Sequence, residues 1–451
     1  MTWTMADLWG YVEPLDPRPR ERHPAVPVRG QNGKAFPVVD PALLSSLDGQ
    51  LEWQRELYKH FHRNPELGLQ EHQTSARIET ELAALGYAVQ RIGGTGVVGV
   101  LANGEGPVVL ARADIDALPV TEDTGLDYSS TIDGVMHACG HDMHIATLLG
   151  AAKVLADHRE AWSGTHVALF QPAEETAAGA KAMVADGLVD KVPRPDVALA
   201  QHVMPVEAGL VGTTAGPILS AGDSLKIIVH GRGAHGSMPH NSVDPVVLAA
   251  SIVLKLQTIV SRETLPGQFA VVTVGSSNAG TAANIIPAKA ELRLNIRTYD
   301  LALREHIMAS IERIVRGECA AAGSPKEPEF EYYDQFPLTS NDADVNEHVT
   351  AAFTEHFPDG QVYQATPATA SEDFSTIPDA FGTPYTYWTV GCAPAEAYRK
   401  AVANGSVSAD IPGNHSPFFA PAIDPTLETA TRTQVVAALA YLGRNQQSKE
   451  G

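Results

Sequence analysis

Residues 165–175 read Thr-His-Val-Ala-Leu-Phe-Gln-Pro-Ala-Glu-Glu, an apolar run that ends abruptly in polar residues. Two further runs behave alike: Val108–Ala111 leads into Arg112-Ala-Asp-Ile-Asp116, and Val197–Ala200 leads into Gln201-His202. Near-continuous apolar runs are typical of strands buried on both faces of a parallel sheet. Because sites gather outside the carboxyl ends of such strands, the three polar segments predict one shared site.

Helical patterns alternate with these strands. Residues 145–155 and 178–186 carry apolar side chains at helical spacing, and Gly187 follows the second pattern as a stop signal. Alternation of this kind predicts the α/β class, with a mainly parallel sheet flanked by helices.

A different pattern begins at Ser224. Its order is strand, helix, strand, strand, helix, strand, over residues 225–229, 245–260, 270–274, 290–297, 303–319 and 330–334. This is the ferredoxin-like arrangement. Since 451 residues exceed the usual limit for one core, we expect an N-terminal arm (1–44), a catalytic domain in two parts (45–221 and 335–451) and an inserted lid or dimerisation domain (222–334).

Composition excludes several classes of partner. The formal net charge is −21, so nucleic acid and anionic membranes would repel the protein at long range. No run approaches the roughly 20 apolar residues of a membrane span, and the first residues lack the apolar core of a secretory signal. Three widely spaced cysteines argue against a disulfide framework and fit a reducing cytoplasm.

Five side chains are candidate metal ligands. Thiolate, imidazole and carboxylate together suit a borderline transition metal, with Zn²⁺ favoured and Mn²⁺, Co²⁺ or Ni²⁺ as alternatives. A purely structural role for the segment His137–His144 is a poor alternative, because its three histidines, thiol and aspartate would each need a buried partner. The candidates are Cys139, His141, Glu175, His202 and His415.

The pair Glu174-Glu175 suggests hydrolysis. A hydrolytic metal site uses one carboxylate as a ligand and another, off the metal, as the base that takes a proton from water. Asp116 is expected to accept the free N–H of a ligating histidine and so fix its tautomer. An alternative uses Cys139 as a nucleophile with His141 as its base.

The predicted insertion carries polar residues within glycine-rich turns. Amide hydrolysis needs donors where charge develops on the carbonyl oxygen, and His235 and Asn284 are of the right type. Arg297 stands at a strand end, where it would bind a substrate carboxylate or, with equal weight, form a structural salt bridge.

The chain resembles the aminoacylase and glutamate-carboxypeptidase family of metallopeptidases, in particular its cysteine-bearing amidohydrolase branch. The resemblance covers residues 50–445. It rests on Arg112-Ala-Asp-Ile-Asp-Ala-Leu-Pro119, His137-Ala-Cys-Gly-His-Asp142, Gln171-Pro-Ala-Glu-Glu175, Gly233-Ala-His-Gly-Ser-Met-Pro-His240, Asn284-Ile-Ile-Pro287, Ser371-Glu-Asp-Phe374 and Asn414-His-Ser-Pro417.

The resemblance implies that the five candidates hold one or two divalent ions, with Glu174 as general base. It also implies a homodimer formed through the insertion, in which His235 and Asn284 serve the partner's site. The wider family has a histidine where this chain has Asp114, so Asp114 is a doubtful ligand. Many members of the branch have glycine where this chain has Met143, which suggests a narrower pocket here.

We therefore expect a metal-dependent amidohydrolase that cleaves N-acyl amino acids into a carboxylic acid and a free amino acid. The same chemistry would serve a dipeptidase or carboxypeptidase, and a binding protein without catalysis is a third hypothesis. The sequence leaves the acyl group and the preferred amino acid open.

Overall fold

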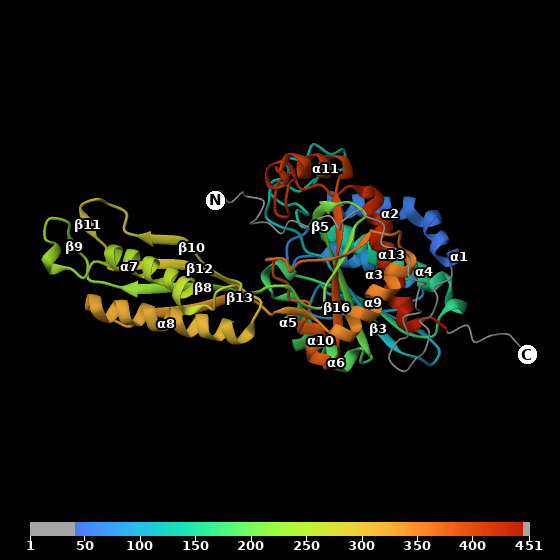
Figure 1. Cartoon of the computed structure of the whole chain (residues 1–451), viewed down its shortest axis with the longest axis horizontal. Helices are drawn as coiled ribbons and strands as arrows, with labels where there is room; N and C mark the ends of the chain where they lie inside the picture. The colour runs from blue at the N-terminus through green and yellow to red at the C-terminus, as the bar shows by residue number, and fades with distance from the viewer. Residues whose placement is uncertain (1–40, 445–451) are drawn as a thin grey trace, which may run out of the picture. The chain divides into compact units, whose positions relative to one another are not determined.

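The computed structural model describes residues 41–444 and separates them into two compact units (Figure 1). The second unit comprises Leu219–Thr339 and Ala368–Glu372, and the remaining described residues form the first. Residues 1–40 of the predicted arm lie outside the described residues. Its last residues begin helix α1 (Pro41–Ser45), and Leu43 and Leu44 are buried in the core of the first unit. These leucines are therefore core residues rather than part of an arm.

An eight-stranded sheet forms the centre of the first unit. Strands β4, β3, β5 and β16 are neighbours in parallel pairs, while β1 and β2 extend the sheet in antiparallel pairs. The prediction of a mainly parallel α/β sheet flanked by helices is confirmed. In sheet order the strands are β1 (Ala88–Arg91), β2 (Val97–Asn103), β4 (Gly164–Gln171), β3 (Val108–Asp114), β5 (Val197–Glu207), β16 (Tyr385–Ala393), β6 (Val211–Thr213) and β15 (Val362–Gln364).

Helix α4 (His141–Asp157) is buried along most of its length and contacts α13 (Ile423–Leu442) and β3. It begins four residues before the predicted helix. Gly140, with φ of +90°, ends the preceding loop in the left-handed conformation that glycine adopts without strain. His141 therefore occupies the first turn. The other helices include α2 (Leu51–Arg63), α3 (His72–Ala84), α5 (Gly179–Ala185), α6 (Leu188–Lys191), α9 (Ala343–His356), α10 (Thr376–Phe381), α11 (Ala395–Asn404) and α12 (Val407–Asp410).

The second unit has its own hydrophobic core. Its four strands form an antiparallel sheet in the order β10, β12, β8, β13, and two helices pack against this sheet and against each other. The chain order is the predicted strand, helix, strand, strand, helix, strand. The elements are β8 (Ala221–His230), α7 (Pro245–Thr258), β10 (Ala270–Ala279), β12 (Lys289–Thr298), α8 (Leu301–Ala322) and β13 (Glu329–Phe336).

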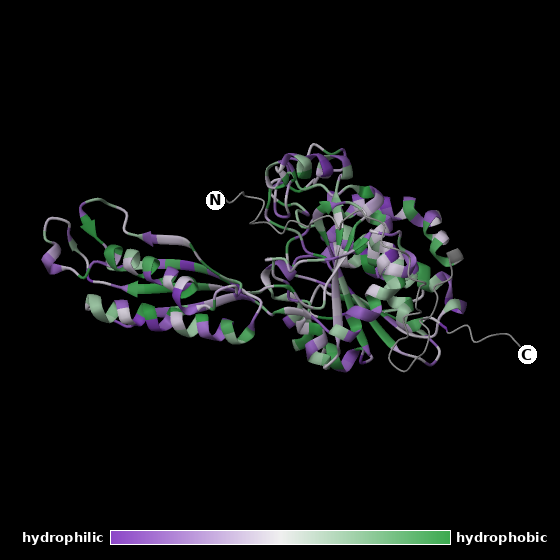
Figure 2. Cartoon of the chain, in the orientation of Figure 1, coloured by the Kyte–Doolittle hydropathy of each residue, from purple (hydrophilic) through white to green (hydrophobic). Residues whose placement is uncertain are grey.

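Helix α7 is unusually apolar, as its colouring in Figure 2 shows. Within residues 41–444, Pro245–Glu263 is the single helical stretch long and apolar enough to cross a membrane by length and composition. Leu248, Ile252 and Leu256 face the core, whereas Val247 and Leu254 are 66% and 73% exposed. The stretch is thus a core helix on one side with an uncovered apolar face on the other.

A buried ionic cluster ties α2 to the start of α4. His62 Nδ1 lies 2.6 Å from Asp142 Oδ2, and its Nε2 lies 3.3 Å from Glu122 Oε1. Since both ring nitrogens face carboxylate oxygens, the ring is an imidazolium. Burial alone would lower the pKa of His62, but Asp142 and Glu122 outweigh it and raise the pKa to about 9. The cluster fixes the residue that follows His141.

Replacing His62 with Gln should lower the free energy of unfolding at pH 7 by about 3–5 kcal/mol, because two buried carboxylates lose their shared cation. The folded pKa is raised, so the stabilisation is complete below the ordinary value of 6.5 and is lost as pH rises through about 9. Urea unfolding at several pH values should show that the difference in the free energy of unfolding between parent and variant becomes smaller above pH 7. His72→Gln, on the exposed surface of α3, serves as the control, and a gap independent of pH would contradict the assignment.

Candidate metal centre

The five candidate ligands come from four separate segments of the first unit. Cys139 precedes α4 and His141 begins it; Glu175 follows β4 in a short 3-10 helix (Glu174–Thr176). His202 lies in β5, and His415 lies in the loop before α13. The parallel strands β4 and β5 carry two of these segments to the same edge of the sheet, where the alternation of strands and helices places a site.

The donor atoms of the candidate ligands lie close together. Cys139 Sγ is 3.5 Å from His202 Nε2, and His415 Nε2 is 3.3 Å from Glu175 Oε2. His141 Nε2 is 3.9 Å from Glu175 Oε1. Ligands at 2.0–2.3 Å around one tetrahedral zinc ion would be separated by about 3.3–3.8 Å. The distances of 3.5 and 3.3 Å fall in this range and the third, 3.9 Å, exceeds it by about 0.1 Å, so the donors are close enough to share a cation.

Two donor atoms are buried without a hydrogen-bond partner among the described residues: His141 Nε2 and Glu175 Oε1. The other nitrogen of His141, Nδ1, lies 2.9 Å from the Asp116 carbonyl oxygen and 3.2 Å from Asp116 Oδ1. Since both neighbours are acceptors, Nδ1 is a donor, and Nε2 is the nitrogen that would bind a cation after losing its proton. Leaving a buried polar atom unsatisfied costs about 1–3 kcal/mol, and a cation would satisfy both atoms.

His202 is oriented in the same way. Its Nδ1 donates to the Val203 carbonyl oxygen at 2.7 Å, so its Nε2 lone pair is turned toward Cys139. Burial, assisted by His144 and His141, holds the pKa of His202 well below its usual value. The ring is therefore neutral, as a ligand must be.

Asp116 contacts two candidate ligands at once. Besides accepting from His141, its Oδ2 accepts the Glu175 main-chain N–H at 3.0 Å. This is the contact that the expected orienting role requires. One buried carboxylate thus sets the direction of an imidazole and of the loop that carries a second ligand.

Negative groups dominate the electrostatics of the site. Burial would lower the pKa of His141, yet Asp114, Asp116 and Cys139 raise it well above its usual value. Hydrogen bonding to Cys139 and then to Glu175 raises the pKa of His415 to about 10. Without a metal, protons therefore balance the carboxylates and the thiol, and a divalent cation would replace them.

Sequence reasoning missed the role of His144, three residues after His141 on α4. Its Nδ1 lies 2.5 Å from Asp114 Oδ1, and its Nε2 accepts the Val203 N–H at 2.9 Å. Although its position beside Asp114, His141 and His202 would suit a ligand, both ring nitrogens are already engaged. His144 therefore supports the site by joining Asp114 to the main chain of β5.

Asp114 is engaged by two neighbours. Arg112, fully buried, donates from Nη1 to Asp114 Oδ2 at 2.7 Å, and His144 holds the other oxygen. Asp114 Oδ2 is still 3.7 Å from His141 Nε2. The buried guanidinium offsets the charge of Asp114, but Asp114 also lies in a group with His141, His144 and His202 whose atoms could hold a metal ion, so the doubt about Asp114 as a ligand stays a prediction.

The loops that carry Glu174, Glu175 and His415 are strained. Within residues 41–444 five non-glycine residues have left-handed φ angles, and Ala173 (+45°), Ala177 (+51°) and His415 (+68°) are three of them. Such a conformation costs roughly 1–2 kcal/mol per residue. Backbone strain concentrated in this way is typical of functional loops.

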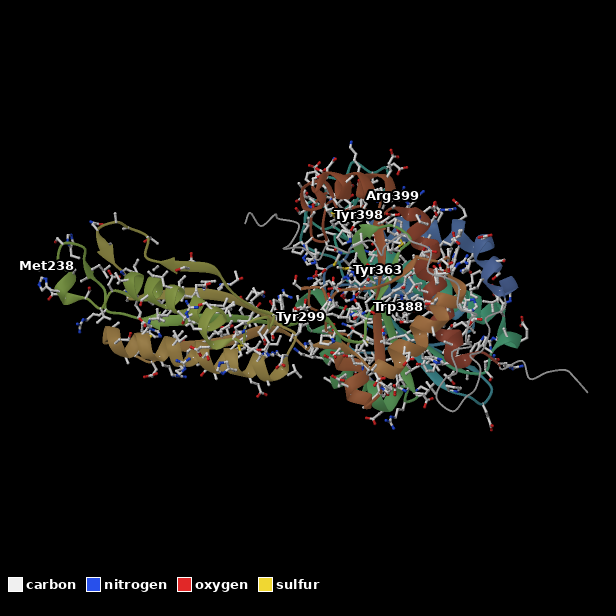
Figure 3. The ribbon with its side chains drawn as sticks, in the orientation of Figure 1. Met238, Tyr299, Tyr363, Trp388, Tyr398 and Arg399 are labelled. Atoms are coloured by element: carbon white, nitrogen blue, oxygen red, sulfur yellow. The ribbon has the colours of Figure 1, made fainter. Side chains whose placement is uncertain are left out.

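The structure places the other predicted site residues in the second unit. His235, on β9 (Ala234–His235), pairs with β11 (Ile285–Ile286), and the Gly236 N–H donates to the Asn284 carbonyl oxygen at 2.7 Å. Both side chains are exposed at the end of the unit marked by Met238 in Figure 3. His235 and Asn284 are therefore neighbours of each other.

Two further residues occupy defined environments. Arg297, on β12, donates from Nε to Asn295 Oδ1 at 2.9 Å and contacts the Ser371 hydroxyl. Met143 is fully buried in the core of the first unit. Met143 lies in the first turn of α4, and the narrower pocket that its bulk suggests stays a prediction.

Comparison with known proteins agrees with this geometry. The family Peptidase M20/M25/M40 matches residues 110–405. An N-acetyl-L-cysteine deacetylase of Bacillus subtilis (strain 168) is 38% identical over 339 residues, 74% of this chain and 79% of the relative. A hippurate hydrolase of Campylobacter jejuni is 39% identical over 332 residues, 73% of this chain and 85% of the relative. The solved structure of a dinuclear metal-binding peptidase of the M20 family from Bacillus subtilis superposes with a TM-score of 0.68 and 27% identity, over 89% of this chain and 99% of that one.

Removal of the thiol tests the candidate centre. Cys139→Ala should weaken zinc binding by more than the roughly 10–100-fold that loss of an outer partner costs, because a direct donor is lost. Competition with a chromophoric chelator measures the affinity. Cys319→Ala removes another buried thiol, in the second unit, and should bind zinc like the parent. Equal affinities of both variants would exclude Cys139 as a ligand.

Proposed function

This chain belongs to peptidase family M20/M25/M40 and is a metal-dependent amidohydrolase, and we propose that its substrates are N-acyl amino acids. It cleaves them to a carboxylic acid and a free amino acid. Two relatives are named for the substrates N-acetyl-L-cysteine and hippurate, and both compounds are acylated amino acids. The observation that carries the proposal is the pair of unpartnered buried donors, His141 Nε2 and Glu175 Oε1, next to the buried Glu174.

In the proposed mechanism the five candidates Cys139, His141, Glu175, His202 and His415 hold the metal. When bound, a divalent metal polarises a carbonyl and lowers the pKa of water toward 7. Glu174 is the general base: it accepts a proton from the attacking water and later donates it to the leaving amine. His235 and Asn284 donate to the oxygen on which negative charge develops, and Arg297 binds the substrate carboxylate.

The metal is proposed to be zinc, with one or two ions per subunit. One thiolate and three imidazoles are a ligand set that zinc favours. Manganese, cobalt and nickel are the alternatives, since availability often decides which metal occupies such sites.

We further propose a homodimer formed through the second unit. The exposed face of α7, defined by Val247 and Leu254, is apolar on a chain whose net charge is −21. Strand β10 is an edge of the four-stranded sheet. Uncovered apolar faces and free edges are both places where a second copy binds. His235 and Asn284 would then act in the partner's site.

The proposed location is the cytoplasm. The three cysteines are buried and free among the described residues, as in proteins of a reducing compartment. The acidic composition fits a small-molecule substrate rather than a polyanionic partner.

The general base can be tested by Glu174→Gln. The amide keeps the size of the side chain but cannot accept the proton, so kcat should fall by about 10²–10⁴-fold while metal content is unchanged. Glu428→Gln, which alters a surface pair with Arg432, is the control. Near-normal turnover with bound metal would remove Glu174 as the base.

The substrate class needs a panel of acetyl, benzoyl and long-chain acyl amino acids assayed beside dipeptides, with and without a chelator. We expect the highest kcat/KM with an acyl amino acid, and loss of activity after metal removal. Preference for dipeptides would favour a peptidase, activity that survives chelation would favour Cys139 as a nucleophile, and no turnover of any substrate would favour a binding protein.

The dimer is tested by placing charge on α7. Val247→Glu combined with Leu254→Glu should convert a dimer to a monomer in sedimentation velocity, because two carboxylates would be buried without partners. Leu301→Glu introduces the same charge at another exposed leucine, 52% exposed on α8, and should leave the dimer intact. A parent chain that sediments as a monomer would refute the proposal.

A further inference from the structure

Two buried carboxylates receive the main-chain N–H groups on either side of Glu174. Asp116 accepts from Glu175, and Glu71 Oε1 accepts from Ala173 at 2.9 Å. We infer that Glu71 is a positioning residue that holds the strained loop 172–179 and thereby aims Glu174. The inference rests on the proposed function and adds a residue that the mechanism does not use.

Glu71 stands at the start of α3 and is completely buried. Both carboxylate oxygens are used, since Oε2 accepts from the Thr95 hydroxyl at 2.6 Å. No basic side chain among residues 41–444 forms an ion pair with it, and burial raises its pKa, although Thr95 and main-chain donors oppose this. A buried carboxylate without a counter-ion is costly. The contact of Glu71 with the Ala173 N–H gives this carboxylate a role that can offset the cost: it positions the main chain before Glu174.

That main chain adopts a strained conformation at Ala173. Ala173 has φ of +45°, a conformation that a residue with a Cβ atom resists. Its carbonyl oxygen accepts from the Ala178 and Gly179 N–H groups at 3.2 and 3.1 Å, while Glu71 holds its N–H. The main-chain N–H and the carbonyl oxygen of Ala173 are therefore both held by hydrogen bonds.

Close packing at two glycines further restricts the conformation of the loop. A Cβ atom at Gly68 would lie 3.0 Å from Ala173 Cβ, and one at Gly179 would lie 1.5 Å from the Pro172 carbonyl oxygen. The main chain therefore passes Ala173 at close range on both sides. Glu174 follows immediately, so a rotation at Ala173 would redirect its carboxylate away from the donors that Asp116 arranges.

The experiment compares Glu71 variants of the full chain, each loaded with zinc and assayed with the best acyl amino acid. Glu71→Ala should lower kcat by about 10–100-fold, the range for partners that orient ligands, with little change in KM. Glu71→Gln keeps an oxygen that can accept the Ala173 N–H and should retain most of the rate. Adding Ala173→Gly to Glu71→Ala should restore part of the loss, because glycine adopts positive φ without strain.

Glu66→Ala is the matched control. This carboxylate accepts main-chain N–H groups of Gln73 and Thr74 in the same segment but does not hold Ala173, so the variant should lose thermal stability and keep kcat. A folded Glu71→Ala protein with parental kcat overturns the inference, as does a double variant no faster than Glu71→Ala. If Glu71→Ala does not fold, the same kcat comparison is made with Glu71→Asp, whose side chain is one methylene too short to reach Ala173. Parental kcat in this variant would overturn the inference.

The outcomes separate this inference from the function on which it rests. An active Glu174→Gln protein removes the general base and the inference with it. An inactive Glu174→Gln protein beside a fully active Glu71→Ala protein removes the inference alone.

Discussion

The double hydrogen bond of Asp116 is the constraint on which the metal centre depends. One oxygen faces the Nδ1 of His141 and the other accepts the Glu175 N–H, so a single buried carboxylate aligns two donors from segments 34 positions apart in the sequence. The Asp116 carbonyl oxygen, 2.9 Å from the same Nδ1, reinforces the orientation of the His141 ring, and the carboxylate is the group that also holds the loop of Glu175. The parallel sheet brings the segments to one edge, and the contacts of Asp116 orient the His141 ring and the loop of Glu175 within the site.

The supporting contacts are arranged in successive layers behind the donors. His62 fixes the start of α4 through Asp142, His144 joins Asp114 to the Val203 N–H, and Glu71 holds Ala173. Each contact joins a charged or polar side chain to a segment next to a candidate ligand. The anionic side chains outnumber the cationic ones at the donor atoms, so binding of a cation is electrostatically favourable. A bound cation would also act as an electrophile beside Glu174.

Much of this was predictable from the sequence because it follows from local periodicity. Apolar runs that end in polar residues indicated the sheet and its functional edge, and the strand and helix order from Ser224 indicated the second unit. The return of Ala368–Glu372 to that unit had no local signal, since it is set by tertiary contacts. The same limit hid His144, because its role depends on which atoms its two ring nitrogens face. The left-handed conformations of Ala173 and Ala177 could not be predicted either, because alanine rarely adopts a positive φ and its presence in a sequence gives no sign of one.

The most direct measurement of the central claim is the zinc K-edge X-ray absorption spectrum of the metal-loaded protein. If Cys139 binds the metal, the spectrum contains one sulfur scatterer at about 2.3 Å together with nitrogen and oxygen scatterers at about 2.0–2.2 Å. This is the shell that Cys139, three imidazoles and Glu175 would create. A shell of nitrogen and oxygen alone would contradict it, because the thiol would then lie outside the coordination sphere and the arrangement around Asp116 would serve some other purpose.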